Sequence, residues 1–394
     1  YDAAINAVVL TDLAEAFQVD LERTGRLTGP IIAVGLGAFG ALPISAIGDR
    51  IGRRPLLIAT TFIYALFTGL TASAQTLGQF IVFQFLARTF LIAEYATAIT
   101  IMTEEFPAAH RGRAMGTLTA LGAFGVPTVA IFNYVLNDTA LGWRSLYLIG
   151  LLPLMLVGVL RLKLKETHRW LEAKAAGVNV KRIAFSGLMK IADRAVLFRV
   201  CALYFLTHFG LLAASYWWPY YAQHQRKFSE EAFTILLVGA YPLGVTGYFV
   251  AGRLQDRYGR RLTGSSFLCG GIFFSALVFQ MSSPVAMFPA LALAVFFGLG
   301  ANPVLNAVVA ELFHTEIRAT AVALARSIFG TLGSIAGPIA VGILADAGME
   351  RKFPGWPVLG DLGDSVTLAT LVLLPAAALF LRLPETAGRE LETI

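Results

Sequence analysis

Five ionisable side chains interrupt long apolar stretches of this chain: Asp2, Arg88, Glu94, His208 and Arg326. A charge at the centre of a membrane-spanning helix costs about 2.5–3.5 kcal/mol, so such residues are usually retained for a function. Carboxylate, guanidinium and imidazole groups can exchange protons, pair with ions or bind polar solutes. No serine, histidine and aspartate lie convincingly at one depth of these stretches, so nucleophilic catalysis is not indicated.

Glu94 lies near the centre of its apolar stretch. It is six residues from Arg88, and because a helix turns 100° per residue the two side chains point about 120° apart. Glu94 is therefore expected to have a role of its own, either in a proton relay or in contact with a cationic group. The alternative is a protonated carboxyl group that is hydrogen-bonded between helices.

Further polar and aromatic residues are candidates for solute binding. His208 can titrate near neutral pH or hydrogen-bond a ligand, or it can be a histidine bonded between helices. Asn302 and Asn306 share one helix face, where they can contact a solute or pack between helices. Tyr216 belongs either to an aromatic cavity wall or to an interfacial belt.

A charged motif occurs twice at one offset of 207 residues. Residues 49–54 return as 256–261, and Glu104 with Arg111 returns as Glu311 with Arg318. Because one offset fits both pairs, we infer a duplicated unit, which is the construction of a secondary transporter. We expect Glu104 to pair with Arg111, and Glu311 with Arg318, across the turns that they bracket.

Helices must position these residues, because the composition is that of a membrane protein. The chain has 394 residues, 57% of them hydrophobic and 14% charged, and its apolar stretches have the length of a bilayer core. A soluble helical protein would expose far too much apolar surface. The expected spans are 1–17, 28–47, 56–74, 79–103, 114–136, 143–162, 196–222, 231–253, 262–281, 285–310, 319–345 and 366–383.

The loops predict the orientation and the domains. Most Lys and Arg residues lie in one alternate set of loops, which places both charged motifs and the C-terminus in the cytoplasm. We expect an N-terminal six-helix bundle over 1–162, a basic cytoplasmic linker over 163–195 and a C-terminal six-helix bundle over 196–394. We interpret the linker as a tether that carries a topology signal.

Other functions have no support in the sequence. Cys201 and Cys269 lie inside apolar stretches, so no disulfide framework or metal site is expected. No phosphate-binding Gly-Lys-Ser/Thr loop is present, so neither ATP nor any other cofactor is implied. The basic residues do not form a nucleic-acid surface. We expect a monomer in a bacterial inner membrane, and an N-terminal piece before residue 1, because the chain begins inside a helix.

The repeated motifs resemble those of the major facilitator superfamily, and in particular its sugar-porter group and the related metabolite and organic-ion transporters. Residues 48–54 resemble the loop 2–3 motif of that family, and 252–261 its loop 8–9 counterpart. Residues 166–171 and 384–388 resemble the motifs that follow the sixth and twelfth helices. The resemblance implies an all-α membrane protein of twelve helices in two pseudo-symmetric bundles.

The resemblance also implies roles for the charged residues. Helices 1, 4, 7 and 10 line the central cavity in this family, and Tyr1-Asp2 resembles a proton site that pairs with an arginine on helix 4, here Arg88. Asn6 lies one turn from Asp2 on the same face. The motif residues that are expected to gate the cytoplasmic side are Asp49, Arg50, Arg53, Glu104, Arg111, Asp256, Arg257, Arg260, Glu311 and Arg318.

The seventh helix argues against a hexose. Residues 206–219 align with the sugar-porter motif of that helix, but Leu206, Thr207 and Leu212 replace the amides that bond sugar hydroxyl groups. A sugar that leaves water would lose the hydrogen bonds of its hydroxyl groups without gaining those amide partners. We therefore expect proton-coupled symport of a small ionisable or aromatic solute. The alternatives are an atypical sugar porter, a proton-coupled exporter, and a receptor or intramembrane enzyme without transport.

Overall fold

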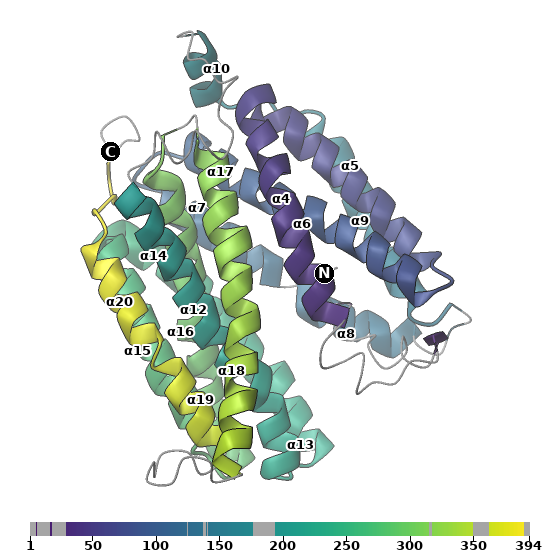
Figure 1. The fold of residues 1–394 in the computed structure, drawn as a ribbon, viewed down its shortest axis with the longest axis vertical. Helices are drawn as coiled ribbons and strands as arrows, with labels where there is room; N and C mark the ends of the chain where they lie inside the picture. The colour runs from purple at the N-terminus through teal and green to yellow at the C-terminus, as the bar shows by residue number, and fades with distance from the viewer. Residues whose placement is uncertain are drawn as a thin grey trace. The chain divides into compact units, whose positions relative to one another are not determined.

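A computed structural model describes residues 5, 16–17, 29–123, 125–136, 139, 141–175, 194–314, 317–349 and 362–389. Over these ranges the chain is helical and contains no strand. Its contacts divide it into two compact units (Figure 1). Unit 1 comprises residues 1–105, 121–192 and 313–328, and unit 2 comprises residues 106–120, 193–312 and 329–394.

Unit 1 is built around the long helix α6, which packs against α4 and α5. Close packing of α4 requires glycine, because a Cβ atom on Gly37 would lie 2.9 Å from the Cβ atom of Arg88. Aromatic rings of Phe80, Trp143 and Tyr147 fill one end of the unit. Its helices are α4 (Gly29–Ile51), α5 (Arg53–Ala72), α6 (Leu77–Glu105), α8 (Gly125–Leu136), α9 (Arg144–Arg161), α10 (His168–Ala175) and α17 (Arg318–Val322).

Unit 2 is built around α16, which packs against α14 and α15, while α12 packs against α18. Gly333 and Gly337 allow the last contact, since a Cβ atom on either would lie 2.2 Å from a carbonyl oxygen of α12. Its helices are most of α7 (Arg111–Ala123), α12 (Arg194–Tyr220), η2 (Tyr221–Gln225), α13 (Glu230–Ile235), η3 (Leu236–Ala240), α14 (Tyr241–Tyr258), α15 (Arg260–Val278), α16 (Pro284–Glu311), α18 (Thr331–Met349), α19 (Leu362–Thr370) and α20 (Leu373–Arg382).

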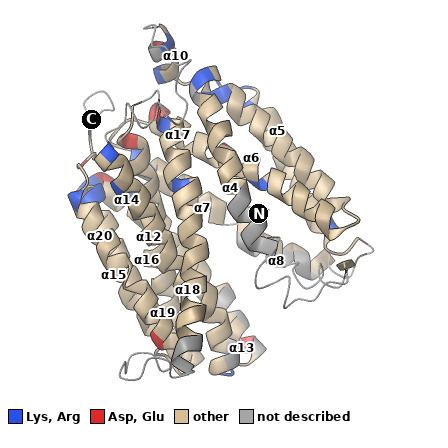
Figure 2. Cartoon of the chain, in the orientation of Figure 1, with Lys and Arg blue, Asp and Glu red and all other residues tan. Residues whose placement is uncertain are grey.

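The expected spans from the second to the twelfth correspond to these helices. Nine helices of the described part are long and apolar enough to cross a membrane. The expected span 319–345 is divided into α17, the π-helical turn η4 (Ala323–Gly330) and α18, and 231–253 likewise contains η3. Lys and Arg gather at the ends of helices such as α5 and α15 and leave most helix centres uncharged (Figure 2). Nearly all of the expected first span lies outside the described residues.

Candidate functional site

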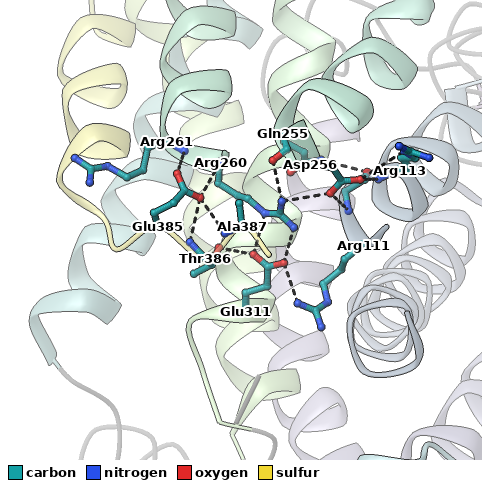
Figure 3. A network of polar contacts seen from close by, with 11 residues as sticks. Arg111, Arg113, Gln255, Asp256, Arg260, Arg261, Glu311, Glu385, Thr386 and Ala387 are labelled. Carbon is teal, nitrogen blue, oxygen red and sulfur yellow. Dashed lines mark hydrogen bonds and ion pairs between the residues drawn. The ribbon is translucent and has the colours of Figure 1, made fainter. Parts of the chain in front are cut away.

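A buried network in unit 2, here called the second network, is centred on Glu311 at the end of α16 (Figure 3). Arg260 donates to it from Nε at 3.1 Å and from Nη2 at 2.8 Å, which is a bidentate contact. Arg111 donates from Nη1 at 3.2 Å, and the Thr386 hydroxyl group also donates to Glu311. The side chains of Glu311, Arg260 and Arg111 are at most 1% exposed, so this carboxylate neutralises arginines that water does not reach.

Asp256 extends the second network to the first turn of α7. It accepts hydrogen bonds from the backbone N–H groups of Gly112 at 2.8 Å and Arg113 at 2.9 Å, and from Arg260 Nη1 at 3.3 Å. These N–H groups have no partner inside their helix, and the positive end of the helix dipole favours the carboxylate. Residue 112 must be glycine, because a Cβ atom there would lie 2.4 Å from Asp256 Oδ1 and 2.8 Å from the Gly252 carbonyl oxygen.

The first network, in unit 1, repeats this plan around Glu104 at the end of α6. Arg53 Nη2 donates to Glu104 Oε1 at 3.1 Å, and Arg318 Nη1 donates to the same oxygen at 2.9 Å. The Thr167 hydroxyl group donates to Glu104 Oε2 at 2.6 Å. These charged side chains are also at most 1% exposed. The centre of each network thus joins one glutamate, two arginines and one threonine.

A second glutamate caps a helix N-terminus in each network. Glu166 accepts from the backbone N–H groups of Arg53 at 3.0 Å and Arg54 at 3.2 Å. Glu385 accepts from those of Arg260 at 2.9 Å and Arg261 at 3.1 Å. These contacts tie the segments after α9 and α20 to the first turns of α5 and α15.

The environment of Glu385 shifts its pKa. Partial burial alone would raise the pKa, but hydrogen bonds from the backbone N–H groups of Arg260, Ala387 and Arg261, together with the charge of Arg260, lower it below the ordinary value. The carboxylate form is therefore the one that the fold stabilises.

Unit 2 also contains a cavity of about 180 Å³ between α12, α14, α15 and α16. His208, Ser215, Ser275 and Asn302 supply polar groups to its wall, and Trp218, Tyr241 and Phe279 supply aromatic rings. Leu212 also lines it, at the position where the sugar-porter motif has an asparagine. The cavity is therefore mainly apolar with a few polar groups, which is typical of a small-molecule site.

A family model of the Major Facilitator Superfamily matches residues 1–338 and 234–392. The chain belongs to this superfamily. It is 28% identical to the niacin transporter of Acinetobacter baylyi, over 100% of this chain and 92% of that protein. It is 28% identical to the cis,cis-muconate transport protein of the same organism, over 84% of this chain and 79% of that protein.

A solved structure of a proton:xylose symporter bound to 6-bromo-6-deoxy-D-glucose has a TM-score of 0.76. It covers 100% of this chain and 94% of its own, and at 18% identity the likeness shows the fold alone. This facilitator is therefore a multi-pass membrane transporter with twelve helices in two pseudo-symmetric bundles, and not an enzyme.

The pairing expected within each turn of this facilitator is wrong. Glu104 pairs with Arg318 instead of Arg111, and Glu311 pairs with Arg111 instead of Arg318. The two acid–arginine partnerships are thus exchanged between the repeats. The reason is that α17 packs against α4 and α6, whereas the first turns of α7 approach α14 through Gly112 and Gly252.

Glu94 pairs with a residue that the sequence did not single out. Arg161, the last residue of α9, donates from Nη1 to Glu94 and to the Thr61 hydroxyl group. The contact pairs Oε1 of a buried carboxylate that lies between three helices, α5, α6 and α9. Arg161 lies at the end of the expected span 143–162, and nothing in the sequence separated it from other arginines at helix ends. Its place at the end of an apolar span does not reveal how far into the unit the side chain reaches.

The remaining candidates occupy varied positions. Asn306 is buried and accepts a hydrogen bond from the Tyr204 hydroxyl group at 3.0 Å, whereas Asn302 and His208 line the cavity. Tyr216 is 59% exposed and is not part of the cavity wall. Arg88 is buried, and Arg50 and Arg257 are exposed. Asp2, Asn6 and the side chain of Asp49 lie outside the described residues.

Sequence reasoning also missed the roles of two Glu-Thr pairs, at 166–167 and 385–386. It used them only as marks of the family, although their recurrence at the ends of both halves was a readable signal. In the structure the glutamates cap α5 and α15, and the threonines bond Glu104 and Glu311.

Proposed function

We propose that this transporter carries out proton-coupled symport of a small ionisable or aromatic solute other than a hexose, by alternating access. The observation that carries the proposal is the exchange of acid–arginine partners between the repeats. Two proposed bundles, 1–162 and 196–394, joined by the linker 163–195, would be locked together at one side by these exchanged contacts and would part when the contacts break. That side is proposed to be the cytoplasm, which also receives the C-terminus, in a bacterial inner membrane.

The two networks are proposed to act as the gate. Removing one partner from a buried ion pair costs about 3–5 kcal/mol because the other charge stays buried. If the gate opens, water reaches both partners, and an exposed pair is worth only about 0–1 kcal/mol. Opening therefore exchanges buried pairs for hydrated charges. Asp256, Arg257, Asp49 and Arg50 are proposed to flank the gate.

Proton coupling is proposed to involve Asp2 and Arg88. When Asp2 is ionised it would hold Arg88 and resist closure around the solute, and protonation would release Arg88. The contact of Glu94 with Arg161 favours a structural ion pair for that glutamate over a proton relay, because its carboxylate already has a cationic partner.

The cavity in unit 2 supports the proposed solute class. Its volume suits a molecule with one ring, and the aromatic wall suits a planar apolar group. His208 and Asn302 are proposed to hydrogen-bond uncharged polar atoms of the solute. Leu212 offers no hydrogen-bond partner to a sugar hydroxyl group. Two relatives are named as transporters of niacin and of cis,cis-muconate, which are small carboxylic acids.

Uptake by purified protein in liposomes tests the proposal. Symport predicts that an inward proton gradient drives accumulation of nicotinate or benzoate, and that Asp2→Asn abolishes accumulation but leaves counterflow. An exporter would show the reverse gradient dependence, and a receptor would bind the solute without flux. Uptake of hexoses in preference to the acids would favour the atypical sugar porter.

A further inference from the structure

Arg326 is half-buried, and its surroundings differ from those of five buried or half-buried arginines that contact a carboxylate. It lies in the π-helical turn η4, and its guanidinium carbon is 3.9 Å from the centre of the Tyr95 ring on α6. Arg53, Arg111, Arg161, Arg260 and Arg318 each contact a carboxylate. Within the described ranges no carboxylate pairs with Arg326.

From this we propose that Arg326 binds the carboxylate of the transported solute, so that the solute is an organic anion. The inference rests on the proposed transport function and deepens it, because it names the charge that the site selects. It is carried by the contacts of Arg326 and Tyr95, both of which belong to unit 1.

The depth of Arg326 supports a function. It lies eight residues beyond Arg318, so the two are about 12 Å apart along the helix axis at 1.5 Å per residue. Tyr95 lies nine residues before Glu104, at a similar distance of about 14 Å from the first network. Since the hydrocarbon core is about 30 Å thick, both residues lie deep within it.

The direction of the side chain argues against a merely tolerated charge. An arginine that escapes the membrane interior extends toward the end of its helix. Arg326 instead reaches a ring at its own depth on another helix. Charged residues at this depth almost always face the interior of a bundle or a water-filled cavity. Both Arg326 and Tyr95 are half-buried, so the packing of the protein does not fully enclose the pair.

The contact with Tyr95 leaves the chemistry of Arg326 available. The ring attracts the positive charge, whereas the five N–H donors lie in the plane of the guanidinium group and are not used by a ring face. Such a planar set of donors matches the two oxygens of a carboxylate. A neutral amide of the same shape cannot form that charged pair, so we expect a preference for the acid of about 10- to 100-fold.

Paired probes test this assignment. Binding of nicotinate and nicotinamide, and of benzoate and benzamide, is measured by calorimetry on the full-length purified transporter. The wild type is expected to prefer the acids. Arg326→Gln is expected to weaken binding of the acids at least 10-fold and to leave binding of the amides nearly unchanged, and Arg326→Lys to restore part of the loss.

Two control variants accompany the test. Arg226→Gln removes an arginine from another ring contact, 5.0 Å from the centre of Tyr221 in unit 2, where Arg226 Nε also donates to the Tyr221 hydroxyl group at 2.7 Å. This variant is expected to leave both classes of ligand unaffected. Tyr95→Phe keeps the ring and is expected to retain the preference for acids. Thermal unfolding of each variant shows whether the fold is intact.

Three results would overturn the proposal: unchanged binding of acids by Arg326→Gln, equal loss of acids and amides in that variant, or no binding of any acid by the wild type. Failure of the transport proposal is distinguishable from these. If the transport proposal alone fails, the protein still binds acids in preference to amides and still loses this preference in Arg326→Gln, but a proton gradient drives no uptake.

Discussion

The two networks use the same residue types but are not equally connected. Arg260 holds Glu311 with two nitrogen atoms, whereas the described contact of Arg53 with Glu104 uses one. The contacts with the exchanged arginines differ in the opposite sense. Arg318 Nη1 lies 2.9 Å from Glu104 Oε1, whereas Arg111 Nη1 lies farther, 3.2 Å, from Glu311 Oε1. The comparison indicates that the second network is held mainly by its own repeat, and that the first depends more on its exchanged partner.

Removal of either central carboxylate has the largest expected effect. Glu311→Gln leaves Arg260 and Arg111 buried without their shared anion, so we expect a loss of about 3–5 kcal/mol in the free energy of unfolding. Glu104→Gln is expected to lose somewhat less, because it has fewer described contacts. Unfolding in detergent measures both. A loss below about 1 kcal/mol for Glu311→Gln would contradict the role given to the second network.

The close approach of α7 to α14 is tested by Gly112→Ala. The added methyl group would collide with Asp256 and with the Gly252 carbonyl oxygen, and overpacking of this kind costs about 1–3 kcal/mol. Gly122→Ala, on the same helix, is the matched control, because no atom lies within 4 Å of its Cβ position. Equal stability of the two variants, measured by thermal unfolding, would show that residue 112 does not limit the approach.

The capping glutamates have the smallest expected effect. The lowered pKa of Glu385 means that its stabilisation is present above the ordinary value of 4.5 and is lost as the pH falls through the lowered value. The group is only half-buried, so we expect less than about 1 kcal/mol. Glu385→Gln should remove this part of the pH dependence of unfolding below pH 5. An unchanged dependence would contradict the capping role.

The sequence predicted the helical class, the duplication and the charged residues of both networks, but not their two threonines. These follow from the length of the apolar stretches and from a repeat at one offset. It did not predict which arginine meets which glutamate, because partners about 200 residues apart depend on how α7 and α17 pack. The partner of Glu94 was missed for the same reason, since Arg161 lies in another part of the chain.

The residues that line the cavity in unit 2 were only partly predictable. All four candidates His208, Asn302, Asn306 and Tyr216 were chosen because they are polar or aromatic residues of apolar helices. His208 and Asn302 line the cavity, whereas Asn306 and Tyr216 do not. A helix position gives the face on which a residue lies, and neighbouring side chains decide whether that face is filled. Ser275 and Tyr241 carried no sequence signal that separates them from packing residues.

A double-mutant cycle tests the exchange of partners most directly. The free energy of unfolding is measured for Glu104→Gln combined with Arg318→Gln, and for Glu104→Gln combined with Arg111→Gln. We predict a coupling energy of about 0.5–3 kcal/mol for the exchanged pair Glu104 and Arg318, and additive effects for Glu104 and Arg111. Coupling of Glu104 to Arg111, with none to Arg318, would contradict the account.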